Sequence, residues 1–181
     1  MKCLFLTQGS SLGRFYGLGQ KLSNGDEHGV VIADSWNYRS WLQQHPNFEN
    51  ENHEILKEWE VTSNRNRQYD LEWIQEKFTK LNAPDLFNSI ISDRRLIMGE
   101  RATYVQNYGR RFDDATLYSI LGSGIEEMES LFDKVCPEVV VGFICVTFLD
   151  YIGYIISRAR GIPYLNLRPT RILSLIHISE P

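Results

Sequence analysis

Short apolar runs alternate with amphipathic segments along this chain. The runs at 2–7, 29–33 and 139–144 are nearly uninterrupted and rich in valine, leucine and isoleucine. Runs of this kind predict strands, and the run at 139–144 is typical of a strand buried on both faces, because neither of its faces meets water. Apolar residues recur at the helical spacing of three and four in four longer segments, at 15–22, 71–81, 113–134 and 148–160.

Weaker signals predict the remaining elements. The aromatic residues of 36–41 predict a short helix, 85–95 predicts another, and 54–61 fits either a helix or a strand. Gly161 occupies the place of a left-handed helix cap, and 162–167 follows it as a further strand. Strands separated by helices in this order predict a doubly wound α/β fold, with a mostly parallel sheet and helices on both faces.

Composition limits the function without choosing one. The chain has 181 residues, 43% of them hydrophobic, and a formal net charge of −4. This acidic balance argues against a nucleic-acid partner bound through its phosphates. No apolar run reaches the roughly 18–20 residues of a membrane span. The 4 histidines have no partners at metal-ligand spacing, so we expect no metal site and solvent-exposed histidines; the 3 cysteines lie in apolar stretches and are expected to be reduced and buried.

The loop after the first strand is the leading candidate site, because ligands of an open parallel sheet bind beyond the carboxyl ends of its strands. Gly9 and Gly13 let the backbone turn tightly and approach a ligand, Ser10 and Ser11 offer hydroxyls, and Arg14 adds a positive charge. With the N–H groups of a helix N-terminus, these residues suit an anion or sugar hydroxyls. The glycine spacing is neither a dinucleotide fingerprint nor a P-loop, and a tight turn with packing glycines is the alternative.

Other candidates follow the later strands. Asp34 either binds a ribose hydroxyl or caps the next helix. Asp150 is either a functional carboxylate or an ordinary residue of the first turn of its helix. Arg168 and Arg171 follow the last strand and could hold a phosphate or carboxylate between two guanidiniums; contacts with solvent or a following domain are the alternative. The charged segment 93–95 is interpreted as surface salt bridges at a helix end.

The end of the chain is unusual. Residues 173–181 resemble the in-frame translation of a transposase adapter used in sequencing libraries. We therefore expect one domain over 1–172, followed by a non-biological tail, and we expect the chain to be the N-terminal fragment of a longer protein. The alternative is a genuine apolar strand at the C-terminus.

Five segments together resemble the N-terminal half of a GT-B glycosyltransferase of bacterial capsule or surface-polysaccharide biosynthesis. They are 8–14, 92–99, 136–142, 158–164 and 167–172. The resemblance spans most of residues 1–172 and rests on the order of its motifs, each of which is common alone. It implies a Rossmann-like domain that binds the sugar acceptor and faces a second such domain that binds the nucleotide-sugar donor.

The resemblance also implies the chemistry. A sugar passes from a nucleotide-sugar to a hydroxyl of a polysaccharide or lipid-linked acceptor, with no tightly bound cofactor. The donor is expected in a C-terminal domain that is missing here, so this fragment should be inactive. We expect a bacterial cytoplasmic protein, free or peripheral at the inner membrane. The family's catalytic base has no residue-by-residue match, and Asp34, Asp150 and His28 are its candidates. Half of a sugar-nucleotide epimerase and a self-contained flavodoxin-like binding module are the alternative functions.

Overall fold

A five-stranded, all-parallel sheet organises the computed structural model of this chain. The structure describes residues 1–9, 11–22, 27–51, 53–64, 67–97, 111–143 and 146–167. The strands are β1 Cys3–Thr7, β2 His28–Ile32, β3 His53–Lys57, β4 Val139–Gly142 and β5 Tyr164–Asn166. Their order in the sheet is β3-β2-β1-β4-β5. This order is the Rossmann order, and it confirms the predicted doubly wound α/β fold.

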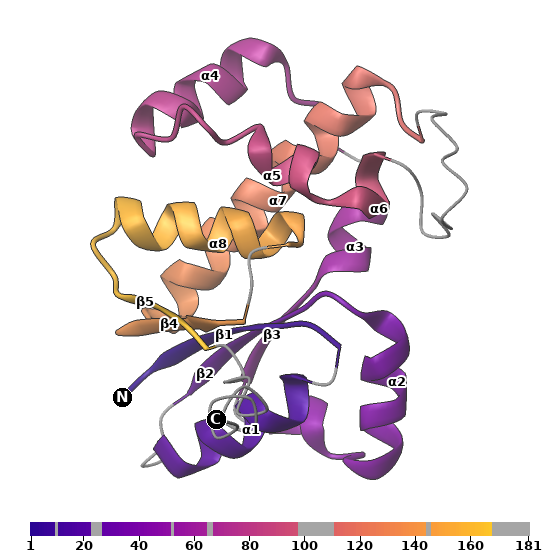
Figure 1. Cartoon of the computed structure of the whole chain (residues 1–181), viewed down its shortest axis with the longest axis vertical. Helices are drawn as coiled ribbons and strands as arrows, with labels where there is room; N and C mark the ends of the chain where they lie inside the picture. The colour runs from indigo at the N-terminus through magenta and orange to yellow at the C-terminus, as the bar shows by residue number, and fades with distance from the viewer. Residues whose placement is uncertain are drawn as a thin grey trace, which may run out of the picture.

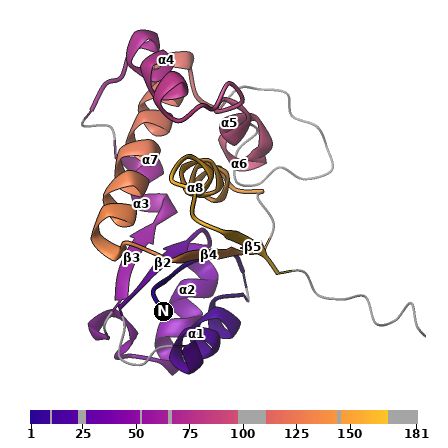
Figure 2. The ribbon, with the colours of Figure 1, turned by 90° about the vertical axis from the view of Figure 1, so that its left-hand side faces the viewer.

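Helices cover both faces of the sheet (Figure 1). They are α1 Ser11–Leu22, α2 Ser35–Gln44, the short 3-10 helix Phe48–Asn50, α3 Glu58–Ser63, α4 Leu71–Lys80, α5 Asn88–Ser92, α6 Arg94–Ile97, α7 Asp114–Val135 and α8 Phe148–Ala159. Figure 2 shows α1 and α2 on one face, with α7 and α8 on the other and α4, α5 and α6 farther from the sheet. No helix in the described part of the chain is long and apolar enough to cross a membrane.

The central strand β1 supplies side chains to two cores. Leu4 and Leu6 belong to the larger core, which α7 and α8 complete. Phe5 points the other way and stacks on Phe15 of α1, with ring centroids 5.7 Å apart. All five residues of β1 are buried. The uninterrupted apolar run in the sequence therefore reflects burial on both faces.

Two ambiguous stretches have definite structures. Residues 54–61, which fitted either a helix or a strand, contain both, because β3 ends at Lys57 and α3 begins at Glu58. The prediction of one helix over 85–95 is wrong. A turn precedes α5, and Asp93 separates α5 from α6 with an extended backbone at φ −90° and ψ 100°. This break allows the Asp93 side chain to turn inward.

Predictions for the cysteines and histidines need partial correction. Cys3 is buried as expected, but Cys136 is exposed, at a helix end where its backbone is left-handed with φ 49°. Cys145 lies outside the described residues. His28 is buried rather than exposed, and its Nδ1 accepts a hydrogen bond from the backbone N–H of Cys3 over 3.2 Å. Gly161 has φ 67° and ends α8 in the predicted left-handed conformation.

The close approach of α7 and α8 gives a test of the packing. A Cβ added at Gly124 of α7 would lie 2.4 Å from a ring carbon of Phe148, which is fully buried. We expect Gly124→Ala to lower the free energy of unfolding by about 1–3 kcal/mol, because the ring has no room to move. Urea denaturation followed by circular dichroism measures the change.

Gly17 of α1 is the matched control. No atom lies within 4 Å of a Cβ added there. Gly17→Ala should raise the free energy of unfolding by roughly 0.5–1 kcal/mol, since alanine is the better helix former. Equal effects of the two substitutions would contradict the described contact between α7 and α8.

Candidate functional site

Two adjoining pockets open at the carboxyl edge of the sheet, beside the point where the strand order reverses around β1. We call the larger, of about 480 Å³, the first edge pocket, and the other, of about 410 Å³, the second edge pocket. They share Ala33, Asp34, Asp93 and Arg95. Volumes of this size suit a small ligand, and this edge is where doubly wound folds bind one.

A third cavity, between α1 and the sheet, is too small for such a role. Phe5, Phe15, His28 and Phe48 are among its lining residues, and its volume of about 20 Å³ accommodates roughly one water molecule. The edge pockets are therefore the candidate functional site.

Two residues predicted as ligand groups in the first loop, Ser11 and Gly13, instead make contacts within the protein. The N–H of Gln8 donates to Ser11 Oγ over 2.7 Å, and the N–H of Ser11 donates to the Gln8 carbonyl over 3.0 Å. Gly13 packs against Trp41, since a Cβ at Gly13 would lie 2.9 Å from the indole ring. Gly9 takes a left-handed φ of 50° and lines the second edge pocket.

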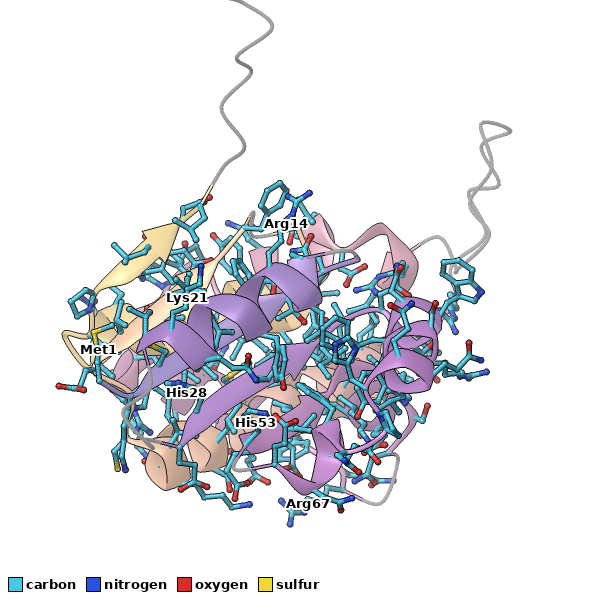
Figure 3. The ribbon with its side chains drawn as sticks, turned by 90° about the horizontal axis from the view of Figure 1, so that it is seen from below. Met1, Arg14, Lys21, His28, His53 and Arg67 are labelled. Atoms are coloured by element: carbon cyan, nitrogen blue, oxygen red, sulfur yellow. The ribbon has the colours of Figure 1, made fainter. Side chains whose placement is uncertain are left out.

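Arg14 lies apart from the other residues of this loop. It is exposed, and Figure 3 shows it near the start of α1. It is not among the residues that line either edge pocket. The predicted candidates Ser10, Arg168 and Arg171 lie outside the described residues, as does the segment 173–181.

Asp34 both caps a helix and faces the edge pockets. Its Oδ1 accepts from the backbone N–H groups of Trp36 and Asn37, over 2.9 and 3.1 Å. Its Oδ2 accepts from the Asn37 side-chain amide over 2.6 Å. The capping role, one of its two predicted interpretations, is therefore confirmed. The side chain still lines both pockets.

An ion-pair cluster lines the first edge pocket, in which a partly exposed Arg95 side chain (38%) meets two buried carboxyl groups. Arg95 Nη2 pairs with Glu58 Oε1 and with Asp93 Oδ2, the latter at 2.7 Å. Arg95 Nη1 donates to the carbonyl of Ala33 over 2.9 Å. Glu58 and Asp93 are 3% and 2% exposed, so the interpretation of residues 93–95 as a surface salt bridge is wrong. Asp93 also accepts from the N–H of Phe148 over 3.2 Å, which ties the cluster to the start of α8.

A third buried carboxyl lies under the first loop. Asp150 is 1% exposed, and its Oδ2 accepts a hydrogen bond from the Gln8 side-chain amide. Its N–H donates to Thr147 Oγ1 over 3.3 Å, which caps α8. Asp150 therefore links the turn after β1 to α8.

Burial is the largest cause of the raised pKa values of Glu58 and Asp150. It raises the pKa of Glu58 to about 8, against the opposing charge of Arg95 and with the help of Asp93 and Asp150. Burial likewise raises the pKa of Asp150 to about 7, although hydrogen bonds from Thr147 and Gln8 favour its charged form. Burial opposes the charged form of Arg95, but its carboxylate partners Asp93 and Glu58 outweigh this effect and raise its pKa, so Arg95 keeps its charge. One guanidinium cannot balance three buried carboxylates, so the cluster holds a proton near neutral pH.

The walls of the first edge pocket combine aromatic and polar side chains. Trp36, Trp59 and Phe112 supply rings, while Thr62 and Ser63 supply hydroxyls. Trp36 is 75% exposed and is the most open of the large apolar side chains described. Within the described residues, no group of three or more His, Cys, Asp or Glu side chains is placed to hold a metal ion.

Glu58 was not among the site residues predicted from the sequence, whereas His28 was a predicted candidate base that the structure places away from the site. Glu58 is the first residue after β3, and applying the strand-edge rule there would have identified it. His28 begins β2, at the opposite end of the strand from the edge pockets. Its Nε2 lies 3.1 Å from the Gly19 carbonyl. His28 therefore serves packing between β2 and α1, and it cannot be a base at the edge.

Comparisons with known proteins identify no family for this chain. No protein-family description and no curated protein matches the chain.

Replacing Arg95 tests the energy of the cluster. Arg95→Met leaves Glu58 and Asp93 buried without their cation, so we expect the free energy of unfolding to fall by about 2–4 kcal/mol. Urea denaturation at pH 7 measures the change. Arg158→Met is the control, because Arg158 makes a half-exposed pair with Asp85 at 3.7 Å, and surface pairs contribute roughly 0–1 kcal/mol. Equal losses in the two variants would rule out a special role for the cluster.

The raised pKa values predict how stability varies with pH. Between about pH 5 and pH 8 the folded state keeps protons on Glu58 and Asp150 that the unfolded chain releases. Stability therefore falls as pH rises, by roughly 2–5 kcal/mol between pH 5.5 and 8.5. Glu58→Gln should flatten this dependence, and Glu60→Gln, at an exposed position of the same helix, should leave it unchanged. Urea midpoints across this range provide the test, and a stability that rises with pH in the unaltered protein would contradict it.

Proposed function

We propose that this chain is the acceptor-binding half of a glycosyltransferase that moves a sugar from a nucleotide-sugar to a polysaccharide or lipid-linked acceptor. The carboxylate-lined pockets at the carboxyl edge carry the proposal. Carboxylates are acceptors for hydroxyl groups, and exposed indole rings offer flat apolar surfaces against which a sugar ring can pack. In the first edge pocket, the carboxyl groups come from Asp34, Glu58 and Asp93, and the indole ring comes from Trp36.

The same features disfavour a phosphate ligand at this edge. A phosphate at the start of α1 needs free N–H groups, yet those of Gln8 and Ser11 are bonded within the loop. Asp34 adds a carboxylate to both pockets. The arginines of the first edge pocket are engaged within the protein, since Arg95 pairs with Glu58 and Asp93 and Arg111 donates to the Arg95 carbonyl. A neutral, hydroxyl-rich ligand fits better than a nucleotide, which favours the acceptor half over the epimerase alternative. The flavodoxin-like alternative loses support too, because that fold has the strand order 2-1-3-4-5.

The proposed transfer requires a donor from elsewhere. In this proposal the nucleotide-sugar is held by a second domain that faces the carboxyl edge. The edge pockets would then place an acceptor hydroxyl toward that domain. We expect no transfer by this chain alone.

Binding of neutral sugars by the full chain tests this function. We expect methyl glycosides of glucose, galactose, N-acetylglucosamine or rhamnose, at millimolar concentration, to shift the backbone amide signals of Gly9, Asp34, Trp36 and Thr147 in ¹H–¹⁵N NMR spectra. UDP and GDP should leave these signals in place. Nucleotide binding at these amides without sugar binding would overturn the proposal.

An exposed tryptophan supplies the matched variant. Trp36→Ala should weaken sugar binding by about 3- to 10-fold, because it removes one aromatic wall at little cost in burial. Ile91 is 68% exposed and is not among the pocket-lining residues, so Ile91→Ala should leave binding unchanged.

A further inference from the structure

The two edge pockets meet at a shared wall. Ala33, Asp34, Asp93 and Arg95 line both of them. Ala33 and Asp93 are buried, whereas Asp34 is partly exposed and 38% of the Arg95 side chain is exposed. The accessible part of this wall therefore consists of one carboxylate and one guanidinium, and a ligand that enters both pockets has to pass over them.

The sizes of the pockets suit two small units rather than one large one. Small-molecule sites commonly measure about 300–1,000 Å³, and the volumes of about 480 and 410 Å³ lie in the lower half of that range. Two pockets of similar size with a common wall fit a ligand of two linked units better than one compact ligand.

The second edge pocket offers the same kinds of contact as the first. Gly9 contributes its backbone, and Ser92 contributes an exposed hydroxyl. Ser92 Oγ donates to the Ser89 carbonyl over 3.2 Å, so its oxygen can still accept a hydrogen bond. Val146 adds an apolar side chain that is 48% exposed, as Trp36 does in the first pocket. A sugar ring has polar edges and apolar faces, so it suits the lining of either pocket.

Asp34 can accept a further hydrogen bond at the junction. Its Oδ1 accepts from two N–H groups of α2, whereas its Oδ2 accepts only from the Asn37 amide among the described residues. A carboxylate oxygen can accept two hydrogen bonds. Asp34 is also partly exposed, whereas the carboxyl groups of Glu58 and Asp93 are buried. A ligand that crosses the shared wall can therefore place a hydroxyl on Asp34 Oδ2.

We propose that the edge pockets are adjacent subsites that bind two linked sugar units of the acceptor, one in each pocket, with a hydroxyl beside their linkage on Asp34 Oδ2. This inference rests on the proposed function and names the acceptor as an oligosaccharide chain rather than a single sugar. The hydrogen bonds from α2 to Oδ1 hold the carboxylate in place before the ligand arrives.

Occupancy of the two pockets by one sugar is the first test. The probe is the methyl glycoside from the panel above that binds the unaltered chain most tightly. At saturation we expect two molecules per chain. ¹H–¹⁵N NMR spectra should show shifts at Trp36 and Ser63 for the first pocket and at Gly9 and Val146 for the second. Shifts confined to one pocket at saturation would overturn the inference.

Disaccharides of the same sugar, one for each linkage position, are the second probe. We expect at least one of them to bind as a single molecule per chain and to shift the amides of both pockets. Its affinity should exceed that of the methyl glycoside about 10- to 100-fold, because the linkage brings the second unit to its pocket. Equal affinity of the methyl glycoside and every disaccharide would overturn the inference and leave the proposed function standing. No sugar binding by the unaltered chain would overturn both.

A variant of the second pocket separates the two subsites. Val146→Trp fills this pocket from an exposed position, so we expect the affinity for the disaccharide to fall to that for the methyl glycoside. Leu165→Trp is the matched control, because Leu165 is 50% exposed and is not among the pocket-lining residues. Equal affinities of the two variants for the disaccharide would overturn the second subsite.

A variant of the shared wall tests the contact with Asp34. Asp34→Ser keeps a side chain that caps α2 but removes Oδ2. We expect the affinity for the disaccharide to fall about 5- to 50-fold. Asp70→Ser, which changes the N-cap of α4 away from both pockets, should bind as the unaltered chain does. Equal affinities of these two variants would overturn the contact, and amide spectra that match outside the pockets confirm that each variant is folded.

Discussion

Arg95 has to satisfy acceptors from three separate segments at once. The Ala33 carbonyl follows β2, Glu58 opens the helix after β3, and Asp93 lies between α5 and α6. Through Asp93 the same cluster reaches the first N–H of α8. The ends of neighbouring strands and the helices that follow them are therefore joined by one guanidinium. The shape of the carboxyl edge depends on this charge remaining in place.

This arrangement has an energetic consequence for the whole edge. Buried carboxylates are expensive, and ion pairing recovers that cost only when the geometry satisfies every group. Here Glu58 and Asp93 share the guanidinium of Arg95, and the buried Asp150 lies close enough to raise the pKa of Glu58 further. Replacing such a cluster with apolar side chains often leaves a fold equally stable. In the proposed function the cluster is a polar surface held rigid in advance, because preorganised groups bind without a further loss of freedom.

The sequence predicts the framework of this protein better than its site. Apolar runs identify β1, β2 and β4 because burial on both faces leaves a direct trace in residue type. The site depends on polar residues, whose burial leaves no such trace. In the sequence, Glu58 and Glu60 flank Trp59, and nothing sets Glu58 apart from its neighbour. Asp93 begins a charged triplet of a kind typical of a protein surface. Only the break between α5 and α6 turns Asp93 inward, and that break follows from packing rather than from periodicity.

The first loop shows how one fold can favour different ligands. A dinucleotide site leaves the backbone N–H groups of this loop free for a pyrophosphate. Here the Ser11 hydroxyl occupies the N–H of Gln8, and the Gln8 side chain is drawn down to the buried Asp150. The loop has thereby lost donors for an anion and gained a carboxyl beneath it. The start of α1 therefore lies beside a buried carboxyl group, and the proposed preference for hydroxyl groups over phosphate rests on this arrangement. The strand order is therefore that of the Rossmann fold, and the proposed preference for a sugar rests on the side chains at its carboxyl edge.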